Sequence, residues 1–201
     1  MKHLPIHSPF TELDAAEVRD LSILFITGLL FWTSITTMLP TLPTYVQELG
    51  GTTQQVGLVM GCFAIGLLFS RTWLGQLADR HSRKIVLLIG TVVGAIAPLG
   101  YLWINSIAGL MAVRAFHGIS IAAFTTAYSA LVIDLSPLKH RGEIVGYMSL
   151  AVPIGMAIGP AVGGILQTSH GYYSISSIRL SKSRNSKERL RNNSTVFSNH
   201  F

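Results

Sequence analysis

Five long apolar stretches constrain the fold of this sequence more than any other feature. The five stretches are residues 21–43, 55–77, 85–104, 107–133 and 144–167. Each holds about 20 residues or more, which at 1.5 Å per helical residue crosses a hydrocarbon core of about 30 Å. Backbone groups inside a bilayer must find their hydrogen-bond partners within the chain. We therefore expect every stretch to be a transmembrane helix.

The composition excludes a water-soluble globule. Only 12% of the 201 residues are charged, about half of the roughly 25% that a soluble domain carries. The formal net charge of +6 does not indicate a nucleic-acid interface, because residues 172–201 hold six Lys and Arg against one acidic residue and so contribute +5 of it. This last part lacks a long apolar run, and we expect a basic, disordered tail.

The basic residues predict the orientation of the helices. Residues 1–20 form an N-terminal segment, residues 21–171 the membrane part and residues 172–201 the tail. When loops are assigned to alternate sides of the membrane, seven cations before residue 172 fall on the N-terminal side and none opposite: Lys2, Arg19, Arg80, Arg83, Lys84, Lys139 and Arg141. The positive-inside rule then predicts a cytoplasmic N-terminus. Five spans would place the basic tail outside, against the same rule.

A charged turn at residues 75–84 joins the second and third stretches. Gly75 would let two helix backbones approach closely, and the Asp79 carboxylate could accept hydrogen bonds from Arg80 or Arg83. An ordinary cytoplasmic loop would explain the basic residues alone. Both interpretations remain open at this point.

The fourth stretch carries polar side chains along one helical face. Arg114, His117, Ile121, Thr125 and Tyr128 are spaced by three or four residues. A charge inside a membrane is costly and usually faces a bundle interior, although a side chain near the end of a span can also snorkel to the interface. His117 fits either a neutral hydrogen-bonding group or a proton relay.

The fifth stretch contains glycines at every fourth position, Gly155, Gly159 and Gly163, followed by Gly164. Such a stripe favours close helix packing, and Pro160 within it removes one backbone donor and can kink the helix. In the first stretch, Thr33, Thr36 and Thr37 share a face. Their hydroxyls could line a cavity or bond back to their own helix.

Three of these motifs together resemble the major facilitator superfamily, in the expected order and over about residues 20–173. Residues 75–84 resemble its loop between helices 2 and 3, with Ser82 where the family has a second glycine, a departure that we expect to tighten or strain the turn. Residues 114–118 resemble its helix-4 motif Arg-x-x-x-Gly. Residues 155–164 resemble the helix-5 motif of its drug:proton antiporters, and residues 134–142 its helix 4–5 loop.

The resemblance implies an all-α membrane protein with five transmembrane helices of an incomplete six-helix N-terminal facilitator bundle. It implies three sets of residues. The transport and coupling residues are Arg114, His117, Thr125, Tyr128, Thr33 and Thr37. The gating-loop residues are Gly75, Asp79, Arg80, Arg83, Lys84, Asp134 and Arg141. The helix-packing residues are Gly155, Gly159, Pro160, Gly163 and Gly164.

The implied function is secondary active transport of a small solute by proton-coupled efflux, in a multi-pass protein of the cell membrane. Membrane lipid, the solute and protons are the expected partners. We expect no nucleic acid, metal or cofactor, and no enzymatic activity. A complete facilitator has two six-helix halves, so we expect these five helices not to transport alone. Two alternatives stay open: a transport-incompetent truncated product, and a membrane interaction protein that associates with itself through glycine-rich faces or with a full transporter.

Overall fold

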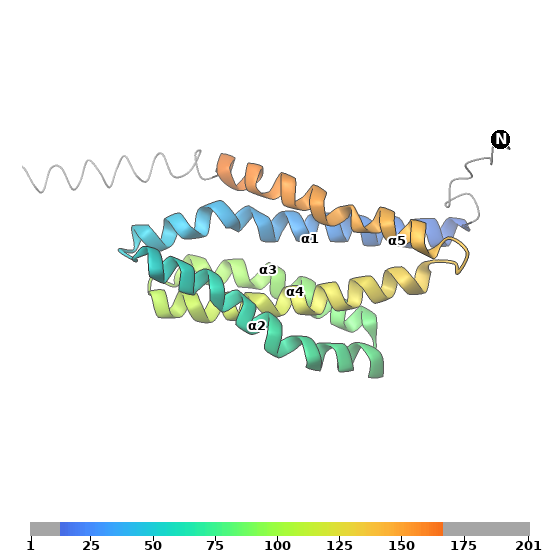
Figure 1. Cartoon of the computed structure of the whole chain (residues 1–201), viewed down its shortest axis with the longest axis horizontal. Coiled ribbons are helices and arrows are strands. Elements are labelled where there is room, and N and C mark those ends of the chain that lie inside the picture. Colours follow the sequence, from blue (N-terminus) through green and yellow to red (C-terminus); the bar gives the residue numbers. More distant parts are fainter. Residues whose placement is uncertain (1–12, 167–201) are drawn as a thin grey trace, which may run out of the picture.

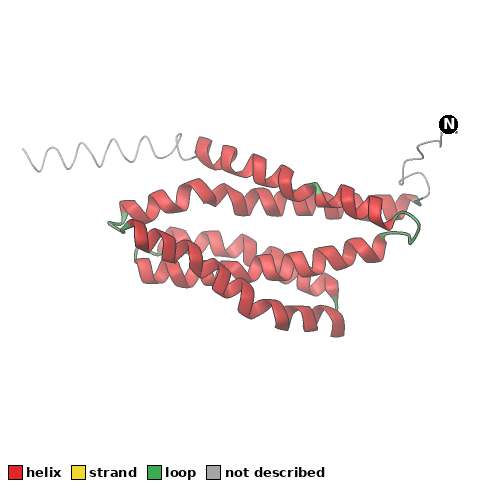
Figure 2. Cartoon of the chain, viewed as in Figure 1, coloured by secondary structure: helices red, strands yellow, loops and turns green. Residues whose placement is uncertain are grey.

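The computed structural model describes residues 13–166, and every regular element in this range is a helix (Figures 1 and 2). The helices are α1 (Ala15–Glu48), α2 (Thr53–Arg80), α3 (Arg83–Trp103), α4 (Ile107–Leu135) and α5 (Arg141–Ser149), and residues 151–166 continue α5 after a turn at Leu150. With Arg141–Leu166 taken as one span, five helices are long and apolar enough to cross a membrane. The predicted all-α membrane fold is confirmed. The expected tail at residues 172–201 lies outside the described residues.

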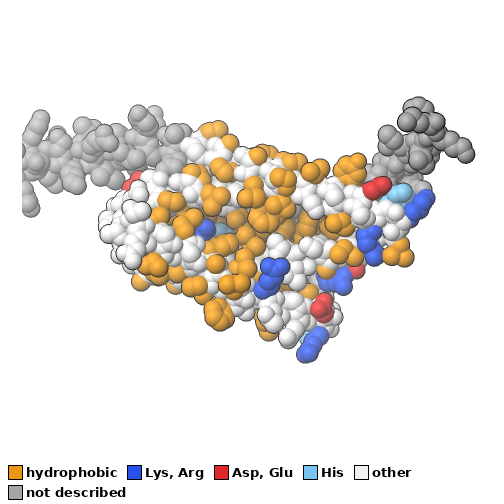
Figure 3. All heavy atoms as spheres, in the orientation of Figure 1, with side chains coloured by type: hydrophobic (Ala, Val, Ile, Leu, Met, Phe, Trp, Pro, Cys, Tyr) orange, Lys and Arg blue, Asp and Glu red, His pale blue; other side chains and the backbone are white. Residues whose placement is uncertain are grey.

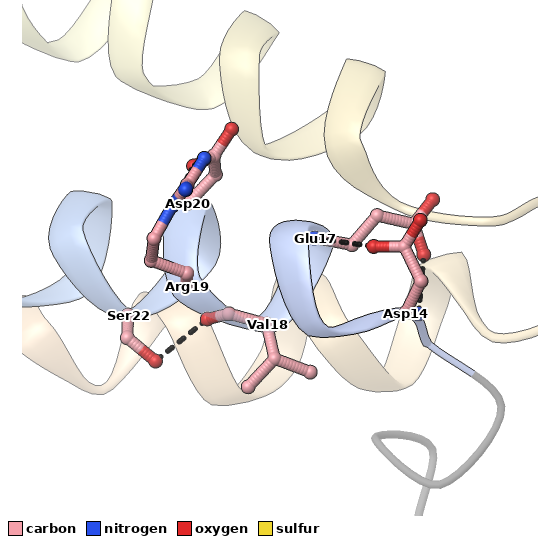
Figure 4. Close-up of polar contacts among 6 residues, drawn as sticks. All are labelled: Asp14, Glu17, Val18, Arg19, Asp20 and Ser22. Atoms are coloured by element: carbon pink, nitrogen blue, oxygen red, sulfur yellow. Dashed lines mark hydrogen bonds and ion pairs between the residues drawn. The ribbon is translucent and has the colours of Figure 1, made fainter.

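Helices α1 and α2 begin before their apolar stretches, at residues whose side chains cap the first turn. The Asp14 carboxylate accepts a hydrogen bond from the Glu17 backbone N–H at 2.8 Å, and the Glu17 carboxylate accepts one from the Asp14 N–H at 3.1 Å (Figure 4). Thr52 and Gln55 form the same reciprocal arrangement at the start of α2. Each capping box satisfies backbone donors that the first helical turn leaves free.

The first helix runs past the end of its apolar stretch. The first apolar stretch ends at residue 43, whereas α1 continues through Pro40 and Pro43 to Glu48. Each proline removes one intrahelical hydrogen bond. The last turns are held by packing instead, because Leu42 and Val46 are buried in a cluster with Val59 of α2 and Leu110 of α4.

Helix α4 lies at the centre of the bundle and packs most extensively on α2 and α3. Glycines make these contacts close. A Cβ atom at Gly66 of α2 would overlap the carbonyl oxygen of Ala115, and one at Gly118 of α4 would overlap that of Phe63. A Cβ at Gly90 of α3 would lie 2.6 Å from the backbone nitrogen of Phe124. The backbones of three helices therefore touch where side chains would normally separate them.

The glycine stripe of the fifth span faces α1, and the two lie side by side in Figure 1. A Cβ at Gly155 would lie 2.6 Å from the Trp32 Cβ, and one at Gly159 would lie 2.7 Å from the Thr33 carbonyl oxygen. A Cβ at Gly163 would overlap the carbonyl oxygen of Thr37. This stripe is therefore covered by α1 within the chain.

Two glycines differ from the expectation of close packing. A Cβ at Gly75 or at Gly164 would meet no atom within 4 Å among the described residues. Gly164 follows Gly163 by one position, about 100° around the helix, and so points away from α1. Pro160 lies inside a helical segment that continues to Leu166.

The surface divides into an apolar flank and a charged end (Figure 3). Large apolar side chains stand out on the flank, with Phe69 83% and Trp103 84% exposed. Charged side chains gather at the end where α1 begins, which also holds the α2–α3 and α4–α5 connections (Figures 1 and 3). The connections at the other end, residues 49–52 and 104–106, contain no Lys or Arg. Such a surface suits a bilayer, where lipid covers the apolar flank.

The contact between α1 and the fifth span (residues 141–166) generates a prediction about two glycines of that span. Gly159→Leu should destabilise the protein by at least about 1–3 kcal/mol, because the new side chain must push the backbone of the fifth span away from that of α1. Gly164→Leu, on the open face of the same segment, should change stability little. Melting temperatures of both variants in one detergent provide the test, and equal losses would show that the stripe does not hold the fifth span on α1.

Candidate transport site

The polar face expected on α4 is buried inside the bundle. Arg114 is 4% exposed, His117 1% and Tyr128 8%, while Thr125 and Ile121 are half-buried. Arg114 is surrounded by protein, so snorkelling to the membrane interface does not account for its position. The helical spacing read from the sequence puts these residues on a face that packs against other helices rather than on an exposed stripe.

Arg114 lies against an aromatic ring from α2. Its guanidinium carbon is 4.5 Å from the centroid of the Phe63 ring, a cation–π geometry. Its Nε and Nη1 atoms are buried and have no hydrogen-bond partner among residues 13–166. A guanidinium carries five N–H donors and stays charged, so this site holds a positive charge with unsatisfied donors.

His117 connects the arginine to α3. The Tyr101 hydroxyl lies 3.3 Å from His117 Nδ1, and both side chains are buried. The Phe63 ring meets the His117 ring edge-on, with centroids 5.7 Å apart. His117 Nε2 has no partner within the described part of the chain. Phe63 and Tyr101 were not among the residues singled out from the sequence, since nothing in a single helix shows which aromatic side chains of its neighbours it will meet.

Thr125 and Tyr128 lie further along α4 and do not join this cluster. The Thr125 hydroxyl donates back to the Ile121 carbonyl at 2.7 Å. The Tyr128 hydroxyl donates to the Met148 carbonyl at 3.1 Å and so ties α4 to α5. Its ring stacks on Phe124, which stacks on Phe31 of α1. The contacts of Tyr128 are those of a packing residue.

The threonines of α1 bond to their own helix, as one of the two sequence interpretations had it. Thr33 donates to the Leu29 carbonyl at 2.8 Å, and Thr37 to the Thr33 carbonyl at 2.7 Å. Thr36 donates to the Trp32 carbonyl and also lies 3.1 Å from the Gly155 carbonyl. This second contact links α1 to the fifth span at the point where the glycines bring them together.

Ion pairing at the charged end joins different residues from those expected. Arg83 forms a salt bridge with Asp134 at the end of α4 and donates to the Ala130 carbonyl at 3.2 Å. Asp79, the expected acceptor, is exposed and has no ion pair among residues 13–166, as is also true of Arg80. Lys84 is exposed and Arg141, partly buried, opens α5. Among the expected loop residues, Arg83 and Asp134 form an ion pair, which joins the start of α3 to the end of α4.

The turn at Ser82 is not strained. Its φ is −164°, which is extended backbone, and no residue other than glycine has a positive φ in the described range. Of the two expected effects, backbone strain is not found, because the chain passes from α2 to α3 without the left-handed conformation that would need glycine.

Two grooves flank α1, and neither is lined by the α4 cluster. One of about 370 Å³ lies between α1 and α5 and is lined by apolar residues such as Phe25 and Met148. The other, of about 290 Å³, lies between α1 and α3 and has Thr27, Ser34 and Thr91 among its lining residues. The Arg114–His117 cluster is instead enclosed between α2, α3 and α4.

Comparison with known proteins places this chain among membrane transporters. A sequence profile of the Major Facilitator Superfamily matches residues 24–178. An uncharacterized MFS-type transporter of Methanocaldococcus jannaschii is 32% identical over 145 residues, 69% of this chain and 38% of that protein. The quinolone resistance protein NorA of Staphylococcus aureus is 27% identical over 153 residues, 76% of this chain and 39% of that protein. The chain thus spans about two fifths of the length of these curated relatives.

The Arg83–Asp134 pair generates a prediction about the charged end. Both side chains are partly exposed, so a double-mutant cycle with Arg83→Gln and Asp134→Asn should give a coupling of only about 0.2–1 kcal/mol that falls with added salt. The same cycle with Arg80→Gln should give none. Unfolding free energies in one detergent measure both, and equal couplings would contradict the pairing.

Proposed function

Since the chain belongs to the major facilitator superfamily, we propose that residues 21–166 are the first five helices of the N-terminal half of a secondary active transporter that exports a small solute in exchange for protons. The family is one of membrane transporters, so the chain is a transport protein and not an enzyme. The cargo, the coupling to protons and the direction of transport form the proposal.

The buried arginine of α4 is the observation that carries this proposal. A structural ion pair would leave Arg114 next to a carboxylate, yet its neighbours are Phe63 and the Tyr101–His117 pair, and two of its nitrogens lack partners among the described residues. An ionisable residue held inside a membrane at such cost marks a substrate or ion pathway. The role fits the helix-4 position that the sequence resemblance assigned to coupling.

Two further observations support efflux by antiport. The glycine stripe that resembles the antiporter motif is in close contact with α1, so the motif is used as a packing surface between two helices of this half. One group of relatives bears the name quinolone resistance protein. A resistance protein that removes a drug is an exporter, and we extend that direction of transport to this chain.

We also propose a cytoplasmic N-terminus. Arg19, Arg80, Arg83, Lys84, Lys139 and Arg141 lie in segments at one end of the bundle, and the connections at the opposite end lack Lys and Arg. The positive-inside rule places the cation-rich end in the cytoplasm.

The orientation predicts the accessibility of single cysteines. In a Cys62→Ala background, a cysteine at His81 should resist a membrane-impermeant maleimide added to intact cells, whereas a cysteine at Gln54 should react. Both positions are exposed and lie at opposite ends of α2. Reversed labelling would overturn the orientation without affecting the family assignment.

The role of Arg114 predicts a loss of coupled transport on its removal. Inside-out vesicles from cells that express a full-length transporter containing these five helices should take up a fluorescent quinolone when acidified inside, and a protonophore should abolish the uptake. Arg114→Ala should remove this uptake while the protein still inserts, and Arg114→Lys should restore little because a point charge does not replace a planar guanidinium.

Arg71 supplies the matched control, because it lies within a span but is exposed. Arg71→Ala should leave uptake near the normal level. Full uptake by Arg114→Ala would refute the role of Arg114. Uptake that persists after the proton gradient collapses would refute proton coupling.

A further inference from the structure

We propose that Arg114 and His117 form a binding site for a carboxylate group carried by a small apolar solute. The proposal rests on the proposed transport function in one respect: the carboxylate would belong to the cargo. It goes further by naming the chemical class that the site recognises, from the charges and hydrogen-bonding groups of this chain alone.

The charge distribution leaves Arg114 without a counter-ion. None of the five apolar stretches contains Asp or Glu. The carboxylates of residues 13–166 lie at helix ends, where Asp134 pairs with Arg83 and Asp20 pairs with Arg19 (Figure 4). A buried charge is stable only when it is paired and hydrogen-bonded. The missing negative group must therefore come from outside the described residues.

The unpartnered groups at this site are hydrogen-bond donors, so they favour a ligand that accepts hydrogen bonds and donates none. Arg114 Nε and Nη1 are donors without acceptors. In the proposed site the Tyr101 hydroxyl donates to His117 Nδ1, which leaves the hydrogen of the neutral imidazole on Nε2 and makes this unpartnered atom a third donor. An ionised carboxylate has two oxygens, accepts several hydrogen bonds and donates none. It matches both the charge and the donor set.

The surroundings favour an apolar body on that carboxylate. The Phe63 ring covers one face of the guanidinium and meets the edge of the His117 ring. The edges of the guanidinium plane carry the unpartnered Nε and Nη1 atoms, which are buried within the bundle. An aromatic acid, with its carboxylate at the arginine and its ring near Phe63, fits both contacts.

Two kinds of molecule could supply a carboxylate that binds Arg114 in this way. It could belong to a free solute, which is the version we propose, or to an acidic side chain of the protein outside residues 13–166. The chain itself offers Glu12 and Glu188 there. A test must therefore detect the carboxylate at Arg114 and also identify its origin.

Nitrogen NMR of the chain in detergent micelles, with ¹⁵N-labelled arginine, observes the site without a transport assay. The Arg114 Nε–H signal is assigned by its absence in Arg114→Lys, and sodium benzoate is the probe. Benzoate should shift this signal saturably, with a dissociation constant at least about tenfold lower than for the uncharged analogue benzamide. The Arg71 signal is the internal control and should not move. His117→Ala should weaken benzoate binding, whereas His117→Gln, which keeps an N–H donor, should retain more of it.

The NMR results distinguish a solute carboxylate from a side-chain carboxylate of the protein. They also test the carboxylate site independently of the proposed export function. A shift by benzoate alone supports the solute site even if no transport is ever measured, since binding does not depend on proton coupling. An Arg114 signal that resists benzoate but moves in Glu12→Gln or Glu188→Gln assigns the carboxylate to the protein and overturns the solute site. Equal shifts with benzamide, equal shifts of Arg71, or no shift in any sample overturn the carboxylate site altogether.

Discussion

Contact between helix backbones is the interaction on which the rest of this structure depends. Lipid tails are as apolar as leucine, so helices in a bilayer are not driven together by the hydrophobic effect and need close packing instead. Gly66 and Gly118 supply it between α2 and α4, Gly90 between α3 and α4, and the stripe at Gly155, Gly159 and Gly163 between the fifth span and α1. These contacts make α4 the central helix of the bundle.

The central position of α4 explains how the chain keeps a charge inside its membrane part. Gly118 is four residues from Arg114, so the turn that carries the arginine is pressed against α2, beside Phe63. Tyr101 of α3 closes the other side through His117. A polar group facing lipid would be costly, whereas one enclosed by three helices can be held ready for a ligand. The packing residues and the candidate site are thus parts of one arrangement.

The sequence allowed the helices to be predicted, because about 20 apolar residues in a bilayer have few alternatives to a helix. It also indicated the buried face of α4 through the spacing of Arg114 and His117. It could not indicate Phe63, Tyr101 or the Arg83–Asp134 pair, since these depend on how separate helices turn toward one another. The same limit explains Gly75 and Gly164: a glycine in a motif permits close approach, but only the rotation of its helix decides whether a neighbour is there.

The most direct test of this account compares two glycines of α2 in lipid nanodiscs. Gly66 touches the backbone of α4, while a Cβ at Gly61, five residues earlier, would meet nothing within 4 Å. The melting temperature of Gly66→Ala should fall by several degrees, because a single methyl group must separate α2 from α4, and that of Gly61→Ala should stay unchanged. Equal melting temperatures for the two variants would contradict the claim that backbone contact at α4 holds the bundle together.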